Sequence, residues 1–490
     1  MNQINIYSSA TDISSAILEQ KITAEAVVKL FLRQCEETNE ALNACLAIYT
    51  NDAIAEAKKM DMAIQRGENP GRLAGVPVIV KANICQKGRE TNCASAILDG
   101  YNSPFDATVV SAIKREGGII IATANMDEFA MGSTGRYSAF SPTLNPWNSN
   151  NVPGGSSSGS AAAVAARMAP ISLGSDTGGS VRQPACFCGT YGLKPSYGSV
   201  SRYGLVSFAS SLDQIGPMAN SIEDIDLCMS VISKHCSKDA TSIQNYQYDN
   251  TNSDSNSLKS IGIPIDVIRK LPDDVRIPFE HRIDQLKKSG INIIDVTMDT
   301  LQYAISTYYI ISSAEASTNL SRYDGVRYGC REDNVTSMKE MMMKTRGNGF
   351  GPEVKKRIMI GTFSLSSGYI DAYYNKAQTV RDLIREEMET ILTRCDIICI
   401  PTTPSSAFRI GQHRSEQEIY MEDILTVPAS LSGLPAISVP CKDNNQSLPT
   451  ALQLIGRFKE DKQLIEHVKQ VESIIGKQKL IPSELNGGTK

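Results

Sequence analysis

Apolar residues recur at helical spacing near the start of the chain. Thr23 can cap a helix whose apolar face includes Val27, Val28 and Phe31. A second helical pattern covers residues 51–66 and stops at a glycine. The beginning of the chain is therefore predicted to form a helical segment that packs against the rest.

Short alternating and buried runs replace this pattern after residue 75. Val76 and Val78 begin an alternating strand that ends at Lys81. A helix is predicted over 107–116, and a short buried strand follows over 119–121. Strand, helix and strand in this order indicate α/β layering.

The same alternation continues to the end of the chain. Further strands are predicted over 171–174, 291–296, 396–400, 436–440 and 451–455. Further helices are predicted over 161–168, 276–289, 302–320, 354–394 and 460–474. We expect an α/β fold with one large domain over 71–490, onto which the helical segment 1–70 packs. Residues 237–258 are polar and are expected to form a surface excursion.

Composition and charge exclude several classes of protein. The chain has 490 residues, of which 41% are hydrophobic and 21% charged, so it can bury a large core. Its net charge is −4, whereas proteins that grip nucleic-acid phosphates usually carry a basic excess. Any RNA contact is therefore expected through a partner or a small local patch.

The 12 cysteines are scattered, and no C-x-x-C pair occurs. Neither a structural zinc site nor a thioredoxin-like motif is predicted, and we expect no bound metal. The N-terminus lacks the basic and apolar regions of a signal peptide, and no apolar run approaches 18 residues. These features predict a soluble, reduced, cytoplasmic protein without a membrane span.

Two Gly- and Ser-rich loops, over 154–160 and 175–180, are the main candidates for chemistry. They could be tight turns, since glycine and serine are common in turns. They could also bind phosphate at helix N-termini, although the Walker and G-x-G-x-x-G patterns are absent. The third interpretation is acyl-transfer catalysis with a serine nucleophile.

A serine nucleophile needs a base. The chain has only four histidines, and none lies between residues 80 and 220. Lysine can take this role if burial lowers its pKa, because desolvation disfavours the charged ammonium. Lys81 ends an apolar strand and is the candidate base, although most lysines are solvated and have no such role.

Three motifs resemble the amidase signature family: residues 74–81 (AGVPVIVK), 154–160 (GGSSSGS) and 174–185 (GSDTGGSVRQPA). The resemblance runs over essentially the whole chain. Within the family it is closest to the glutaminase subunits of tRNA-dependent amidotransferases, on residues 125–132, 208–217 and 357–363. It implies an amidase signature fold, with a large mixed central β-sheet covered by α-helices on both faces.

The resemblance also implies the catalytic residues. It makes Ser180 the nucleophile, Ser156 the bridging serine and Lys81 the base, with a cis peptide before Ser156. It assigns the oxyanion hole to the backbone amides of Thr177, Gly178 and Gly179. Cys186 and Cys188 follow the nucleophile loop, and small buried packing is their expected role rather than redox sensing or metal binding.

Glutamine binding requires that the protein recognise both α-groups of the free amino acid. A bidentate arginine suits the carboxylate and an aspartate suits the ammonium. By resemblance, Arg357 and Asp423 take these two roles, and Tyr309 lines the same pocket. Solvated helix faces, or plain core for the tyrosine, are the alternatives, and Lys356 is a close rival of Arg357.

The resemblance implies partners as well. This chain itself is expected to hold no cofactor. It would hydrolyse glutamine and pass the ammonia to a larger partner, the B subunit, which uses ATP and Mg²⁺ to amidate Glu-tRNA(Gln), while a small C subunit joins the two. Whether Asp-tRNA(Asn) is also a substrate stays open. A freestanding amide hydrolase and a non-catalytic or nucleotide-binding protein are the alternative functions.

Overall fold

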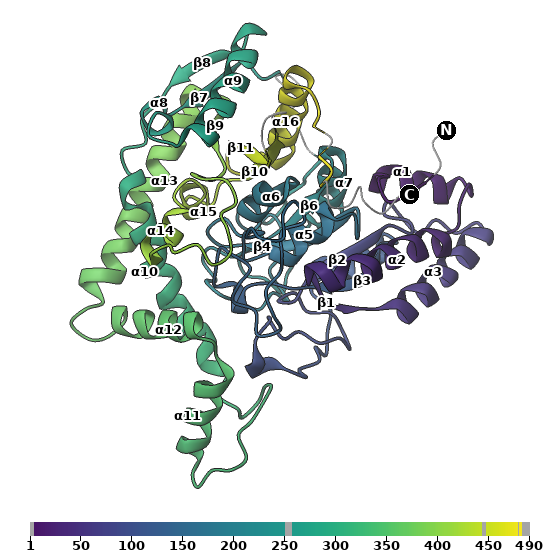
Figure 1. Ribbon diagram of the computed structural model, residues 1–490, viewed down its shortest axis with the longest axis horizontal. Coiled ribbons are helices and arrows are strands. Elements are labelled where there is room, and N and C mark those ends of the chain that lie inside the picture. Colours follow the sequence, from purple (N-terminus) through teal and green to yellow (C-terminus); the bar gives the residue numbers. More distant parts are fainter. Residues whose placement is uncertain (1–3, 250–256, 443–446, 479, 483–490) are drawn as a thin grey trace.

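The computed structural model describes residues 4–249, 257–442, 447–478 and 480–482, which build one mixed β-sheet surrounded by helices (Figure 1). The sheet has 11 strands in the order β1-β3-β2-β4-β6-β5-β10-β11-β9-β7-β8. The strands are β1 (Cys45–Ile48), β2 (Pro77–Lys81), β3 (Ile119–Ala124), β4 (Ile171–Asp176), β5 (Tyr191–Lys194), β6 (Gln214–Ala219), β7 (Ser260–Ile263), β8 (Asn292–Asp295), β9 (Ile397–Pro401), β10 (Ala436–Cys441) and β11 (Thr450–Ile455).

The helices vary from a single turn to five turns. The α-helices are α1 (Ala10–Leu18), α2 (Ala24–Leu42), α3 (Thr50–Gln65), α4 (Thr108–Arg115), α5 (Ser158–Ala165), α6 (Arg182–Cys188), α7 (Ile222–Ile232), α8 (Ile265–Ile268), α9 (Asp273–Lys288), α10 (Leu301–Asn319), α11 (Met338–Gly349), α12 (Pro352–Ser364), α13 (Lys376–Arg394), α14 (Glu416–Met421), α15 (Val427–Leu431) and α16 (Asp461–Ile475). Short 3₁₀ or π turns are η1 (Ala96–Leu98), η2 (Glu128–Ala130), η3 (Leu320–Arg322) and η4 (Asp371–Asn375).

The central strands are buried along their whole length. Every residue of β2, β3, β4 and β6 is buried, and the same holds for β9, β10 and β11. Because successive side chains of a strand point to opposite faces, complete burial requires cover on both faces of the sheet. The predicted α/β fold with a mixed, helix-covered sheet is confirmed.

The N-terminal segment contains a strand as well as helices. β1 pairs antiparallel with β3, with Cys45 opposite Ala124 and Ile48 opposite Ala122. The sequence interpretation described this segment as helical and missed the strand, because four residues between two helices are too short to show a period. The segment therefore contributes an edge of the same sheet.

Other differences from the predicted elements arise at glycines and prolines. The helical region predicted over 354–394 is divided into α12, η4 and α13. β5 (YGLK) and β6 (QIGPMA) were not predicted, because glycine and proline interrupt their apolar runs. Their pairing partners in the sheet supply the hydrogen bonds and cover that make them strands.

The polar excursion predicted over 237–258 falls partly outside the described residues, which omit 250–256. Its described residues contain neither helix nor strand. Two tyrosines tie it to the protein: the hydroxyl of Tyr248 donates to Asp226 at 2.8 Å, and that of Tyr246 donates to Asp461 at 2.6 Å. Tyr248 is buried, whereas described neighbours such as Lys238, Gln244 and Gln247 are exposed. The described part of the excursion is therefore anchored through its tyrosines and exposed between them.

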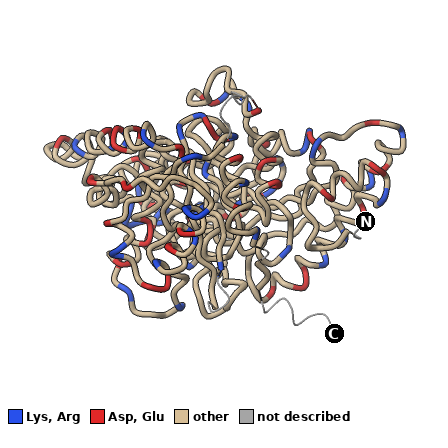
Figure 2. The backbone as a smooth tube through the Cα atoms, turned by 90° about the horizontal axis from the view of Figure 1, so that it is seen from above, with Lys and Arg blue, Asp and Glu red and all other residues tan. Residues whose placement is uncertain are grey.

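Basic and acidic residues are interspersed over the molecule, as Figure 2 shows. This mixture agrees with the small net charge of −4. Among the described helices, none combines the length and apolar character needed to cross a bilayer.

Two parallel strands place the candidate loops side by side. β2 and β4 pair in parallel, with Val78 opposite Ile171 and Val80 opposite Leu173. The carboxyl ends of parallel strands lie at the same edge of the sheet. The end of β2, which carries Lys81, therefore meets the loop that follows β4.

Candidate active site

Lys81 lies in a buried cage of serine hydroxyls. Its Nζ is 2.8 Å from Ser156 Oγ, 2.8 Å from Ser157 Oγ and 2.9 Å from Ser175 Oγ. The Ser175 carbonyl is a fourth neighbour at 3.3 Å. A neutral amine donates two hydrogen bonds and accepts one, so a cage of hydroxyls allows one serine to donate to the amine.

Burial lowers the pKa of Lys81 to about 7. The side chain is fully buried, and desolvation disfavours its ammonium form. The carboxylates of Asp127 and Asp176 oppose this shift, but they do not cancel it. A substantial fraction of Lys81 is therefore uncharged at neutral pH.

The first Gly-Ser loop presents Ser156 to this amine. The Gly155–Ser156 peptide is cis, and the Ser156 carbonyl accepts a hydrogen bond from the N–H of Asp127 at 3.1 Å. The Gly155 N–H donates to the side-chain oxygen of Gln183 at 2.9 Å. The loop is thus anchored on both sides of the serine.

Sequence reasoning missed two of the serines that surround Lys81. Ser157 directly follows the predicted bridging serine, and Ser175, which was expected in the second loop, lies near the end of β4. The Ser157 hydroxyl donates to the Ser175 carbonyl at 3.1 Å, and Asn83 donates to the Ser175 hydroxyl at 2.9 Å. Serine-rich composition was the available signal, but it did not distinguish these serines from turn residues.

Ser180 lies at the rim of the same site. It is 7% exposed, whereas Ser156 and Lys81 are fully buried, so Ser180 lies nearer to the surface than the other two. The N–H of Ser157 donates to the Ser180 carbonyl at 3.1 Å and joins the two loops. Within the described part of the chain, the Ser180 hydroxyl has no hydrogen bond to Ser156.

A buried ion pair closes the loop that carries Ser180. Asp176 and Arg182 are both fully buried, and Arg182 donates to the two carboxylate oxygens at 2.9 and 3.0 Å. Arg182 also donates to the Thr426 carbonyl at 2.8 Å. Because Asp176 and Arg182 flank residues 177–181, their pairing fixes both ends of the loop.

The predicted oxyanion residues form the turn between these two ends. The N–H groups of Thr177, Gly178 and Gly179 have no hydrogen-bond acceptor among the residues that the structure describes. A Cβ at Gly178 would lie 2.6 Å from the ring of Tyr308, so only glycine fits there. Gly179 has a φ of +145°, which also favours glycine. The turn therefore offers free backbone donors next to Ser180.

Arg357, Tyr309 and Asp423 form one cluster, although they come from three separate segments. The Arg357 guanidinium lies 4.5 Å from the centre of the Tyr309 ring. The Tyr309 hydroxyl donates to Asp423 at 3.4 Å, and Ser133 donates to the same carboxylate oxygen at 3.2 Å. Burial raises the pKa of Asp423 to about 7, against the opposing effect of Arg357.

The structure separates Arg357 from its rival, Lys356. Arg357 is 3% exposed and uses its Nε to donate to Glu353 at 2.7 Å. Lys356 contacts the same Glu353 at 2.8 Å, but it also pairs with Glu416 at 3.0 Å and is partly exposed. The terminal Nη groups of Arg357 have no hydrogen-bond partner among the described residues.

The Asp423 segment contacts the turn directly. Thr426 donates to the Gly178 carbonyl at 2.6 Å and to the Asp423 carbonyl at 3.0 Å. Tyr308, the neighbour of Tyr309 in α10, packs against Gly178. The cluster of charged residues and the Ser180 loop therefore belong to one site.

Cys186 and Cys188 are buried beside this site. Burial raises the pKa of the Cys186 thiol to about 12, and it raises that of the Cys188 thiol as well. Both thiols are therefore protonated at neutral pH. Over the described residues, no group of histidine, cysteine, aspartate or glutamate side chains has the arrangement of a metal site.

Comparisons with known proteins agree with this geometry. The sequence profile of the family described as Amidase matches residues 26–465. The chain is 47% identical to the A subunit of a glutamyl-tRNA(Gln) amidotransferase from Chlamydia pneumoniae, over 94% of this chain and 93% of that protein. It is 44% identical to the corresponding protein from Fusobacterium nucleatum, over 97% of this chain and 98% of that protein.

Solved structures extend the comparison. The A subunit of the glutamyl-tRNA(Gln) amidotransferase from Thermotoga maritima matches with a TM-score of 0.79 and 38% identity, over 96% of both chains. A peptide amidase from Stenotrophomonas maltophilia has the same fold, with a TM-score of 0.77 and 23% identity, over 95% of this chain and 96% of that one. The profile and these relatives cover nearly the whole chain, and the chain therefore belongs to the amidase family.

Proposed function

We propose that this chain is the glutaminase subunit of a tRNA-dependent amidotransferase. It hydrolyses glutamine, and the ammonia is used by a partner subunit to convert Glu-tRNA(Gln) to Gln-tRNA(Gln). The similarity to A subunits of such enzymes over more than nine-tenths of the chain supports this assignment. Asp-tRNA(Asn) is a second candidate substrate.

The first step is acylation of Ser180 by the side-chain amide of glutamine. Neutral Lys81 takes a proton from Ser156, and Ser156 takes one from Ser180, whose oxygen forms a bond to the amide carbon. Collapse of the tetrahedral intermediate breaks the C–N bond, and the proton returns through Ser156 to the leaving ammonia. The 2.8 Å contact between Lys81 and Ser156 supports this route.

Water completes the reaction. A water molecule gives a proton to Lys81 through Ser156 and attacks the acyl carbon. The ester bond to Ser180 then breaks, the proton returns through Ser156 to the Ser180 oxygen, and glutamate is released. The negative charge that develops on the carbonyl oxygen in both steps needs hydrogen-bond donors. The free N–H groups of Thr177, Gly178 and Gly179 suit this role, and one such donor is worth about 3–4 kcal/mol in a transition state.

The arrangement of Arg357 and Asp423 is the observation that supports a free amino acid as the substrate. The guanidinium of Arg357 is buried, and its two Nη groups, which no described residue accepts from, fit a carboxylate in a bidentate manner. A buried aspartate fits an ammonium group, and Tyr309 lies between the two charges. A hydrolase of simple amides has no need for such a pair beside its nucleophile.

The partners follow from the reaction. ATP and Mg²⁺ act in the B subunit, which also binds the tRNA, and the C subunit joins it to this chain. The net charge of −4 supports this division, because a chain that gripped tRNA by itself would need a basic surface. The reaction serves protein synthesis, so we propose a cytoplasmic location.

The substitution Ser180→Ala tests this function in the complex with the B and C subunits. We expect glutamine-dependent amidation of Glu-tRNA(Gln) to fall by at least about 10⁴-fold, because the nucleophile is gone. Amidation with ammonium chloride as the nitrogen donor should continue. The matched control is Ser160→Ala in α5, because the Ser160 hydroxyl donates to the Leu173 carbonyl and, among the described residues, has no contact with Lys81 or Ser180.

Two outcomes would contradict the proposal. Loss of both glutamine-dependent and ammonia-dependent amidation would mean that Ser180 has a structural role. Fast hydrolysis of simple carboxamides by the chain alone, without stimulation by partner subunits and Glu-tRNA, would favour a freestanding amide hydrolase.

A further inference from the structure

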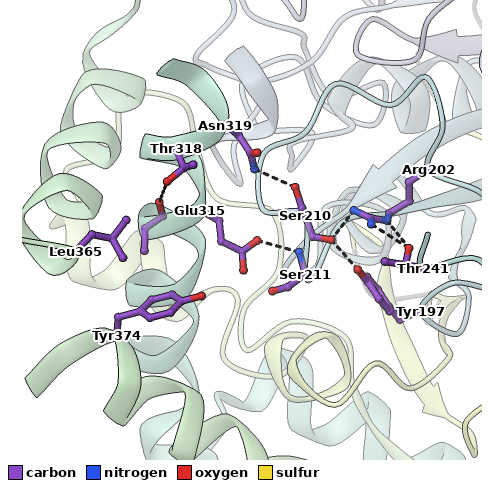
Figure 3. A pocket seen from close by; sticks show the side chains of 11 residues that line it. Tyr197, Arg202, Ser210, Ser211, Thr241, Glu315, Thr318, Asn319, Leu365 and Tyr374 are labelled. Atoms are coloured by element: carbon purple, nitrogen blue, oxygen red, sulfur yellow. Dashed lines mark hydrogen bonds between the residues drawn. The ribbon is translucent and has the colours of Figure 1, made fainter. Parts of the chain in front are cut away.

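A hollow lies against the turn that contains Ser210 and Ser211 (Figure 3). Its volume is about 530 Å³. Ser210, Ser211, Glu315 and Asn319 are among the residues that line it. Figure 3 shows the side chains of Glu315 and Asn319 directed toward the two serines at its centre. We call residues 208–213, which include these serines, the supporting turn.

Side chains from several elements hold the supporting turn. The Ser211 N–H donates to Glu315 of α10 at 2.9 Å, and Asn319 of α10 donates to Ser210 at 3.1 Å. Arg381 of α13 donates to the hydroxyl and the carbonyl of Ser211 at 3.0 and 2.9 Å. These bonds fix the backbone of the turn from the side of the hollow.

The other end of the supporting turn reaches the proposed oxyanion hole. Asp213 is 3% exposed and accepts a hydrogen bond from the Thr177 hydroxyl at 2.7 Å. The second oxygen of Asp213 accepts from the Phe208 N–H at 2.9 Å. Glu315 is therefore linked to Thr177 by one hydrogen bond at Ser211, the backbone from Ser211 to Asp213 and a second hydrogen bond at Asp213.

We propose that the supporting turn positions the oxyanion hole, with Asp213 and Glu315 as positioning residues. The inference rests on the proposed role of Thr177, Gly178 and Gly179 as oxyanion donors. Asp213 holds the side chain of Thr177, which orients the first of the three peptide N–H groups. Glu315 holds Ser211, which keeps Asp213 at the correct distance from Thr177.

The expected effect falls on the rate of chemistry rather than on binding. Oxyanion donors act only when they lie at about 2.7–3.1 Å from the developing charge, so a small displacement weakens them in the transition state. Neither Asp213 nor Glu315 belongs to the cluster of Arg357 and Asp423. Their removal should therefore lower kcat for glutamine and leave KM nearly unchanged.

The first test is a double-mutant cycle on Thr177 and Asp213 in the full-length chain. In Asp213→Asn, the amide oxygen of the asparagine can still accept from the Phe208 N–H. The amide NH₂ group then faces Thr177 in place of the carboxylate oxygen that accepted from its hydroxyl. Thr177→Val removes the hydroxyl and keeps the backbone N–H. We expect each variant to lower kcat by about tenfold to a hundredfold, with KM within about twofold of wild type.

The cycle separates positioning from a general loss of structure. If Asp213 acts through the Thr177 hydroxyl, the double variant is no slower than the slower single variant. Independent losses that multiply in the double variant would overturn the proposal. A parallel rise in KM would do so too, because it would mean that the substitutions disturb the whole site.

The second test concerns Glu315. Glu315→Gln keeps a side-chain oxygen for the Ser211 N–H and should retain kcat within about threefold of wild type, whereas Glu315→Leu should lower it about tenfold. Equal activity of the Leu and Gln variants would overturn the role of Glu315. Thermal midpoints, measured on each variant, show whether the protein is folded.

A covalent probe distinguishes a failure of this inference from a failure of the proposed function. A fluorophosphonate labels an activated serine with the help of an oxyanion hole and needs no glutamine pocket. We expect the labelling rate of Ser180 to follow the same order as kcat across the variants. A wild-type chain that reacts with the probe but does not hydrolyse glutamine would contradict the proposed function only. Equal labelling of wild type, Asp213→Asn and Thr177→Val would contradict the inference.

Discussion

Two buried lysines end strands of the same sheet, and only one of them has the surroundings of a base. Lys81 ends β2 and Lys194 ends β5, and each is at most 1% exposed. Burial is the largest cause that lowers the pKa of either group, in both cases to about 7. The two regions therefore contain amines of similar charge state.

Their neighbours differ in kind. Lys81 contacts three serine hydroxyls, one of which belongs to Ser156. Lys194 donates to the Pro195 carbonyl at 3.0 Å, and this is its one hydrogen bond within the described residues. A carbonyl has no proton to give, whereas a hydroxyl can lose one to a neutral amine. Burial creates an uncharged lysine, and the neighbouring hydroxyls decide whether it is a base.

Replacement of each lysine by methionine tests this comparison most strongly. We expect Lys81→Met to lower kcat for glutamine hydrolysis by about 10³–10⁴-fold, because general base catalysis is lost. Lys194→Met is the matched control and should change kcat less than about threefold. The measurement is steady-state release of ammonia. Equal losses in the two variants would show that both lysines are structural.

Replacement of Lys81 by arginine retains a positive charge but removes the base. A guanidinium does not give up its proton near neutral pH, so Lys81→Arg should be within about tenfold of the activity of Lys81→Met. The same ammonia assay applies, with circular dichroism as a control for folding. An arginine variant with wild-type activity would exclude Lys81 as the base.

The pH dependence of kcat provides a smaller and more specific effect. Since Lys81 must be neutral, kcat should rise about tenfold per pH unit below the pKa of about 7 and level off above it. We use kcat because Asp423, with a pKa of about 7, also affects the binding of glutamine. Lys194→Met should show the same profile. A profile that is flat from pH 5 to 9, roughly two units on either side, would contradict a titrating base.

The smallest expected effect is on stability. The pKa of Lys194 is lower in the folded protein than its ordinary value of 10.5, so the unfolded chain binds an extra proton between about pH 7 and 10.5. Burial of Lys194 therefore lowers the stability of the folded protein at pH 7, and this destabilisation becomes smaller as the pH rises. Lys194→Met should be more stable than wild type at pH 7, and the difference should shrink by up to about 1.4 kcal/mol per pH unit.

Urea denaturation of Lys194→Met and wild type at pH 7, 8 and 9 (steps of about one unit) measures this difference. A constant stability gap across this range would mean that Lys194 keeps its proton in the folded protein. Lys194 and Lys81 would then differ in charge state as well as in their neighbouring groups.

The motifs made much of the site predictable. Lys81, Ser156 and Ser180 lie in or beside the three motifs, and these motifs meet because β2 and β4 are parallel neighbours. Ser157 and Ser175 were not predicted, since their contact with Lys81 depends on how the two loops fold onto each other. Asp213 was missed for the same reason.

The charged cluster was harder to predict than the serine loops. Arg357 and Lys356 are adjacent in sequence and chemically similar, and both contact Glu353, but Arg357 is buried against Tyr309 whereas Lys356 is partly exposed and reaches Glu416. Asp423 reaches the same site from a segment more than 60 residues away in sequence. Residues separated this far show no common period, so only the fold brings them together.

The amino-acid sequence alone determined the α/β class and the two serine loops, because the alternation of apolar residues and the positions of glycine depend on local geometry. Tertiary structure alone decided which lysine has hydroxyl neighbours, which cation faces Tyr309 and which carboxylate holds Thr177. Burial and proximity act through space, and the chain acquires them only when distant segments pack together.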